Sequence, residues 1–185
     1  HRVDRRQRQM CIRDRYCDIM GAQHEIPLMV SAYQKGIRNY DVDKAYEAVK
    51  KTLTTQGTAL SSGGIVGNRH LDVYLKYGFV PYGEKSHHNV FGTTYEGPTS
   101  NTLEYAFDDW NAAQFAKALG YEEDYDYFTR RAYNYKNVFD SETKYVRPKY
   151  SDGTWMPDFE PINKDEHSTS WSWLGSGFVE GNSWQ

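Results

Sequence analysis

Five segments of the sequence carry apolar residues at helical spacing, and this periodicity constrains the fold more than any other feature. The segments extend from about residues 25 to 37, 42 to 53, 68 to 77, 101 to 119 and 122 to 139. Loops of uneven length separate them. Amphipathic helices joined in this way pack side by side as antiparallel hairpins. We therefore predict an all-α fold in which the long loops carry short strands or turns.

The first three segments show recognisable helix ends. Pro27 suits the first turn of a helix that begins near Glu25, and Gly78 ends the third segment. Two apolar stripes are expected to face the core: Ile26, Met29, Val30, Tyr33 and Ile37 in the first segment, and Val42, Ala45, Tyr46, Val49 and Leu53 in the second.

The fourth segment places three acids among aromatic residues. One of them, Glu104, lies about 100° around the helix from Leu103, at the edge of an apolar stripe. A carboxylic acid partly removed from water keeps its proton more readily, as a general acid must. The alternative is a capping box, in which Asn101 caps the helix and Glu104 reaches back to it, and spacing alone favours this reading. The stripe expected to face the core comprises Leu103, Ala106, Phe107, Trp110, Ala113 and Gln114.

In the fifth segment the aromatic residues gather on one stripe and the cations lie off it. Arg130, Arg131 and Lys136 fall outside this stripe, on the side that an amphipathic helix turns to water. The stripe itself comprises Tyr121, Tyr125, Phe128, Ala132, Tyr135, Val138 and Phe139.

Residues 140–185 lack helical periodicity, and a loop of this length usually builds a site. We expect residues 147–155 to form an extended edge with a turn at Asp152 and Gly153. Near the C-terminal end, three residues around a glycine offer carboxylate or amide oxygen atoms, and calcium prefers oxygen ligands of this type. A plain aromatic turn is the alternative. These residues are Glu180, Asn182 and Gln185.

The first fifteen residues do not read as native protein. Residues 5–15 resemble the translation of a transposon-based sequencing adapter, with a basic arm for nucleic acid or membrane as the alternative. The whole chain has 22 basic and 25 acidic residues; residues 1–15 hold six Arg and two Asp, which leaves 16 basic and 23 acidic residues and a net charge of −7. This balance argues against nucleic-acid binding. We read residues 16–185 as an internal fragment in which neither a membrane span nor a signal peptide is visible.

Histidine and aromatic residues add weaker signals. His24 lies at the N-terminal edge of the first helical segment, where side chains often point into a site, although a capping or surface histidine is the alternative. The adjacent His87 and His88 lack the spacing of a helical metal pair, so no zinc site is predicted. Aromatic residues make up 16% of the chain, which suits either stacking on sugar rings or filling of a core.

Five blocks occur along the chain in a fixed order, and together they resemble a known family. The blocks are residues 23–37, 77–81, 101–110, 131–140 and 180–185. They include the sequences Thr-Leu-Glu-Tyr-Ala-Phe-Asp-Asp-Trp and Glu-Gly-Asn-Ser-Trp-Gln. In this order, and over about residues 21–185, the chain resembles glycoside hydrolase family 92, whose members are calcium-dependent, exo-acting α-mannosidases.

The resemblance implies a fold and a mechanism. It implies an N-terminal β-sandwich, absent here, followed by an (α/α)6 barrel of which residues 16–185 form a part truncated at both ends. It also implies inversion, in which a general acid protonates the leaving oxygen while a base activates water from the opposite face. The family's acid maps to Glu104. The base is an aspartate expected beyond Gln185, so the 185 residues alone are expected to be inactive.

The resemblance further implies which residues meet ligands. His24, Thr102 and Glu180 are expected to contact a terminal α-linked mannose of a glycan. Asn182 and Gln185 are expected to bind calcium, through the oxygen atoms that this cation prefers, or else to contact the sugar. A bacterial protein of this family would be periplasmic, cell-surface or secreted.

Two alternatives of different classes remain. One is another (α/α)6 glycosidase, trehalase-like or glucoamylase-like, which also pairs distant carboxylates. The other is a helical interaction module without enzymatic activity, in which Glu104 only caps a helix. Such a module predicts internal repeats, and the helical segments share no motif of fixed period, which favours an enzyme.

Overall fold

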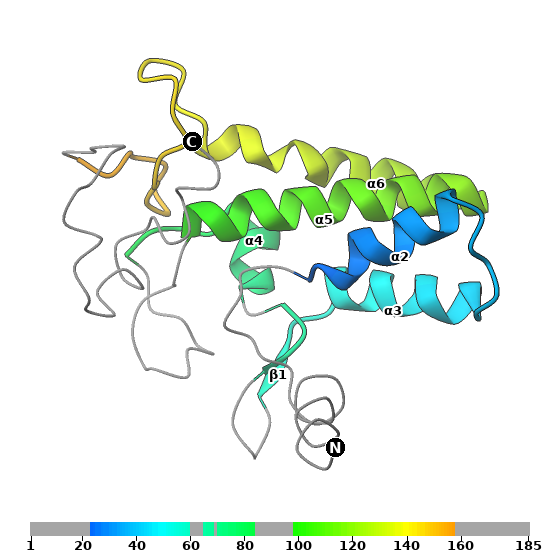
Figure 1. Cartoon of the computed structure of the whole chain (residues 1–185). Helices are drawn as coiled ribbons and strands as arrows, with labels where there is room; N and C mark the ends of the chain where they lie inside the picture. The colour runs from blue at the N-terminus through cyan, green and yellow to red at the C-terminus, as the bar shows by residue number, and fades with distance from the viewer. Residues whose placement is uncertain (1–22, 60–64, 69, 84–97, 158–185) are drawn as a thin grey trace, which may run out of the picture.

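The computed structural model describes residues 23–59, 65–68, 70–83 and 98–157, and these residues form two helical hairpins (Figure 1). In the first hairpin α2 (Glu25–Gln34) is followed by α3 (Val42–Thr54). In the second, α5 (Pro98–Leu119) is followed by α6 (Glu122–Ala132) and the 3-10 helix η2 (Tyr133–Val138). The short helix α4 (Leu71–Tyr77) and the antiparallel strands β1 (Thr58–Ala59) and β2 (Ile65–Val66) lie between them in sequence. The predicted all-α class is confirmed.

The first helices of the two hairpins lie side by side and run in the same direction (Figure 1). Near the C-terminal ends of α2 and α5, the rings of Tyr33 and Phe115 are 5.1 Å apart. From α3, Tyr46 meets the edge of Phe115 at 5.6 Å and stacks on Tyr121 at 4.8 Å. One apolar core therefore joins both hairpins, as expected for neighbouring units of a helical barrel.

Helix ends follow local chemistry. Asp41 caps α3, because its Oδ1 accepts the N–H of Lys44 at 3.1 Å. Gly78 ends α4 with φ at 74°, and a Cβ at this position would come within 2.8 Å of the Asn137 side chain. Gly120, with φ at 83°, reverses the chain between α5 and α6.

Two predicted apolar stripes extend beyond the helices that carry them. The first was expected to reach Ile37, but α2 ends at Gln34 and Ile37 is 54% exposed, because the chain turns at Gly36 with φ at 84°. The fifth segment changes from α-helix to 3-10 helix after Ala132. This change in residues per turn alters which side chains of the stripe face the core: Tyr135 and Phe139 are exposed, whereas Val138 stays buried. Tyr121, which precedes α6, is also exposed.

On α5 the buried face agrees with the predicted one only in part, at Ala106 and Ala113. Phe107 and Trp110 were expected in the core but are 43% and 50% exposed, whereas Asp108 and Asp109 are completely buried. The reason is that α5 packs against α2, α3 and α6 on other sides, so its apolar residues are not confined to one stripe. Its buried side chains include Tyr105, Asp108, Asp109, Ala112, Phe115 and Ala116.

Arg131 lies off the predicted apolar stripe of its segment, yet it is buried at the centre of the structure. Its Nη2 lies 2.8 Å from Oδ1 of Asp109, its Nε donates to Oδ2 at 3.1 Å, and its Nη1 donates to the carbonyl of Leu53. The hydroxyl of Tyr74 also donates to Asp109 Oδ2, at 2.9 Å. Burial raises the pKa of Asp109 to about 7, against the opposing effects of Arg131 and Tyr74. These contacts link α3, α4, α5 and α6.

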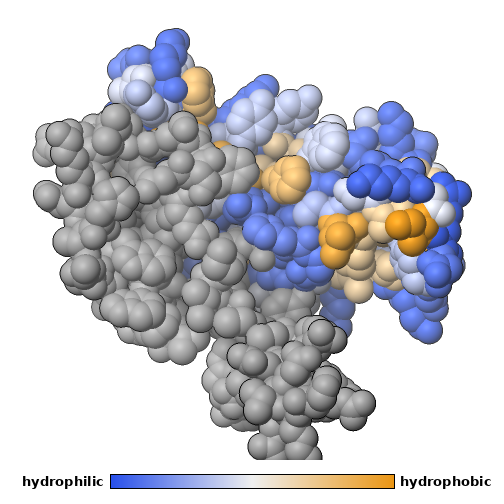
Figure 2. Space-filling model, in the orientation of Figure 1, coloured by the Kyte–Doolittle hydropathy of each residue, from blue (hydrophilic) through white to orange (hydrophobic). Residues whose placement is uncertain are grey.

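On the face shown in Figure 2, the described residues are mostly hydrophilic, with hydrophobic side chains gathered over the region of α2. Leu28 on this helix is among the most exposed large apolar residues. In the part of the chain that the structure describes, no helix is both long enough and apolar enough to span a bilayer.

Replacing Arg131 with Met in the full-length protein is expected to lower the free energy of unfolding by about 3–5 kcal/mol, because Asp109 loses its cation while it stays buried. As a control, Lys50→Gln breaks the more exposed pair between Lys50 and Asp124, and should cost less than about 1 kcal/mol. Urea denaturation measures both. Equal losses in the two variants would contradict a central role for Arg131.

Candidate active site

An acid and a histidine that are distant in sequence meet where α2 begins beside α5. His24 Nε2 lies 3.2 Å from Glu104 Oε2. The side chain of Glu104 is 17% exposed, and that of His24 is 62% exposed. This contact permits donation in either direction: from an imidazole N–H to a carboxylate, or from a carboxylic acid O–H to an unprotonated ring nitrogen. The hydrogen bond therefore orients the Glu104 carboxyl group in either arrangement, and the exposed His24 side chain leaves the pair accessible from solvent.

A second contact between the same two chain segments lies one helical turn away. The backbone N–H of Gln23 donates to Oδ2 of Asp108 at 3.1 Å. Asp108 is completely buried, and its Oδ1 has no hydrogen-bond partner among the described residues. Burial raises the pKa of Asp108 well above its usual range, and the charges of Glu104, Asp109 and Glu25 add to this effect, while the Gln23 N–H opposes it.

The capping-box reading of Glu104 is wrong. Helix α5 begins at Pro98, so Asn101 and Glu104 lie inside the helix rather than at its N-terminus. The Glu104 carboxyl group instead contacts His24 Nε2 across the helix pair.

Thr102 occupies a different environment from Glu104. It is completely buried, its hydroxyl donates to the carbonyl of Pro98 at 2.7 Å, and it accepts the N–H of Val80 at 2.9 Å. These contacts hold the chain after α4 against α5. Contact of Thr102 with substrate stays a prediction.

The other predicted site residues lie outside the described part of the chain. Glu180, Asn182 and Gln185 all belong to residues 158–185, so neither the substrate contact nor the calcium site expected there is tested. Among the described residues, no group of three His, Cys, Asp or Glu residues is placed to hold a metal ion.

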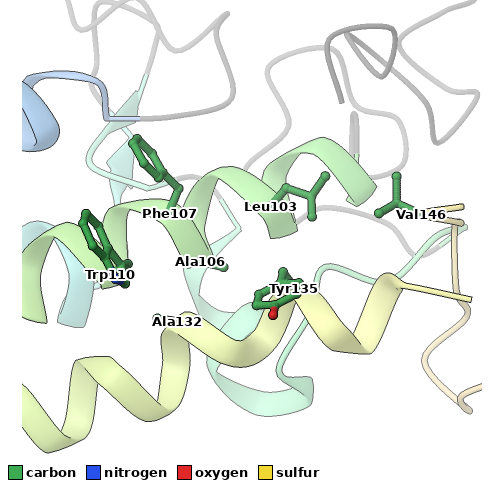
Figure 3. Close-up of a pocket in the computed structure, with 7 residues that line it drawn as sticks. All are labelled: Leu103, Ala106, Phe107, Trp110, Ala132, Tyr135 and Val146. Carbon is green, nitrogen blue, oxygen red and sulfur yellow. The ribbon is translucent and has the colours of Figure 1, made fainter. Parts of the chain in front are cut away.

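A groove of about 380 Å³ lies on the side of α5 that is turned away from its buried aspartates. The side chains of Leu103, Phe107 and Trp110 project from α5, and Tyr135 projects from η2 beneath them (Figure 3). Val146 closes the far end. Apart from the Tyr135 hydroxyl the lining is apolar, so this groove mainly supplies apolar contact.

Asp108 and Gln23 are the site residues that sequence reasoning missed. A usable signal was present, because residues 104 and 108 are separated by four positions and therefore share a helix face. The contact with Gln23 had no local signal, since 85 residues separate the two partners.

A comparison with protein families identifies one family. The model of the glycosyl hydrolase family 92 catalytic domain matches residues 8–185. The match begins within the first fifteen residues, whose interpretation as adapter sequence stays a prediction.

Individual relatives belong to the same class. A family GH92 α-mannosidase from Bacteroides thetaiotaomicron, solved in complex with mannoimidazole, is 33% identical and superposes with a TM-score of 0.63 over 78% of this chain and 16% of its own. A family GH92 inverting mannosidase of the same organism is 31% identical, with a TM-score of 0.65 over 78% of this chain and 18% of its own. An uncharacterized secreted glycosidase of Arthroderma benhamiae is 29% identical over 69% of this chain and 17% of its own length. The chain thus spans less than a fifth of each of these relatives.

Replacing Thr102 with Val in the full-length protein is expected to lower the free energy of unfolding by about 1–3 kcal/mol, because the buried N–H of Val80 loses its acceptor. Thr102→Ser keeps the hydroxyl and should lose much less. Thermal or urea unfolding compares the variants. A Val variant as stable as the Ser variant would show that the hydroxyl has no structural role.

Proposed function

Because the chain belongs to glycosyl hydrolase family 92, we propose that the full-length protein is an inverting α-mannosidase that releases terminal α-linked mannose from glycans. The solved relatives support this substrate and outcome, since both are mannosidases, one is named as inverting, and one was solved with mannoimidazole bound. The secreted relative supports a location outside the cytoplasm: periplasmic, cell-surface or secreted.

The observation that carries the proposal is the position of Glu104 beside His24. Glu104 is largely removed from water yet still reachable, and its partner is a histidine rather than a permanent cation such as Arg. A histidine can either donate to a carboxylate or accept from a carboxylic acid, so His24 can orient Glu104 both before and after it transfers a proton.

In the proposed mechanism Glu104 protonates the glycosidic oxygen as the bond to the sugar breaks. His24 orients the carboxyl group and contacts the substrate from the exposed side. In inverting glycosidases the base lies about 6.5–9.5 Å from the acid, which leaves room for the attacking water. We assign the base to an aspartate outside these 185 residues.

Calcium and the remaining sugar contacts belong to the proposal through the C-terminal block. Glu180 would bind the sugar, and Asn182 and Gln185 would present amide oxygens to the cation, which is the donor chemistry that calcium prefers. Calcium in such a site would bind sugar hydroxyls and help to hold a distorted ring.

Replacing Glu104 with Gln in the full-length protein should lower kcat about 100-fold or more on a mannoside with a poor leaving group, because proton donation is lost. A substrate with an activated aryl leaving group should be affected far less. Glu123→Gln, an exposed acid on α6, serves as the control. Survival of near-normal activity on the poor leaving group would reject Glu104 as the general acid.

Thorough chelation of calcium should abolish mannoside hydrolysis by the full-length protein, and added calcium should restore it. The experiment is done by activity assay before and after treatment with a calcium chelator, with magnesium added back as the control. Full activity after chelation would refute the metal assignment without affecting that of Glu104.

A further inference from the structure

We propose that Asp108 is a positioning residue, a buried neutral carboxylic acid that fixes the chain before α2 so that His24 meets Glu104. The inference rests on the proposed role of Glu104 as general acid. Asp108 would set the position of His24 relative to Glu104 without touching the substrate, because Asp108 is completely buried.

The geometry links the two contacts directly. Gln23 and His24 are adjacent in the chain, and their partners Asp108 and Glu104 are one turn apart on α5. Both backbone polar groups of Gln23 are engaged, because its N–H donates to Asp108 and its carbonyl accepts the N–H of Ile26 at 2.8 Å. The peptide groups on both sides of the Gln23 Cα are therefore held by hydrogen bonds, which fixes the backbone from which the largely exposed His24 side chain extends.

The surroundings of Asp108 favour its neutral form. The charged groups that act on it are Glu104 and Asp109 on α5 and Glu25 on α2, all of which are acids. In the described part of the chain no cation pairs with Asp108, since Arg131 is engaged by Asp109. A buried carboxyl group with one hydrogen bond and no cation is more stable when protonated.

The neutral form also suits the neighbouring site. A carboxylate at Asp108 would place a second negative charge one turn from Glu104, where it would couple the titrations of the two groups. A neutral Asp108 supplies the acceptor for Gln23 without this coupling. The two consecutive aspartates thus have separate roles: Asp109 pairs with Arg131, and Asp108 holds Gln23.

The test compares Asp108→Asn and Asp108→Leu in the full-length protein, with the exposed Asp126→Asn as the matched control. Asn keeps an acceptor oxygen and no charge, so kcat should stay within about threefold of wild type and the pH–rate profile should superimpose. Leu keeps the volume but cannot accept the Gln23 N–H. Its kcat should fall about 10- to 100-fold on a poor leaving group, with a much smaller loss on an activated one.

Two results would overturn the inference. A displaced alkaline limb in the pH–rate profile of Asp108→Asn would show that the native carboxyl group is ionised. An equal loss on both leaving groups in Asp108→Leu would show a purely structural effect. If the loss in Glu104→Gln did not depend on the leaving group, the assignment of Glu104 as general acid would fail. That result is separate from the two results above, which concern Asp108 alone.

A stability measurement decides the charge state even if the Leu variant does not fold. Since folding raises the pKa of Asp108, the native state retains a proton that the unfolded chain releases, and the wild type loses stability as pH rises above about 4. Asn does not titrate. The free energy of unfolding of Asp108→Asn relative to wild type should therefore increase between pH 5 and about pH 8. A constant difference over this range would overturn the inference.

Discussion

The ion pair between Arg131 and Asp109 is the interaction on which the rest of the described structure depends. It lies where α5 and α6 cross the ends of α3 and α4, and it satisfies groups on all four helices. Hydrophobic contact alone leaves helices free to slide and rotate against each other. A buried charge is costly unless its partner lies beside it, so it restricts how the helices can pack. The pair therefore sets the rotation of α5, and with it the direction in which Asp108 and Glu104 project toward the start of α2.

Helix α5 carries three acids whose surroundings differ. Asp109 is buried with a permanent cation, Asp108 is buried with a backbone N–H, and Glu104 reaches the surface beside a histidine. The three side chains are alike in chemistry and differ in what surrounds them. In the proposed mechanism these three acids of one helix have separate tasks: Asp109 serves packing, Asp108 serves positioning, and Glu104 supplies the proton.

Sequence reasoning succeeded where one physical effect dominated. The stripe of α3 was correct at Tyr46, Val49 and Leu53, because that helix packs on one side only. The stripe predicted for α5 was wrong at Phe107 and Trp110, because α5 has neighbours on several sides and its buried acid is paired with an arginine of α6. No local rule predicts a partner 22 residues away in sequence. The ordered blocks identified the family that the catalytic-domain match then confirmed, while the roles of individual site residues stay predictions.

The groove beside η2 has a practical consequence for handling the molecule. Phe107, Trp110 and Tyr135 leave a continuous apolar surface open to water, and surfaces of this kind promote self-association. A polypeptide limited to these hairpins is therefore expected to self-associate through this face. Polar replacements of Phe107 and Trp110 on α5 should reduce that tendency without touching the buried core.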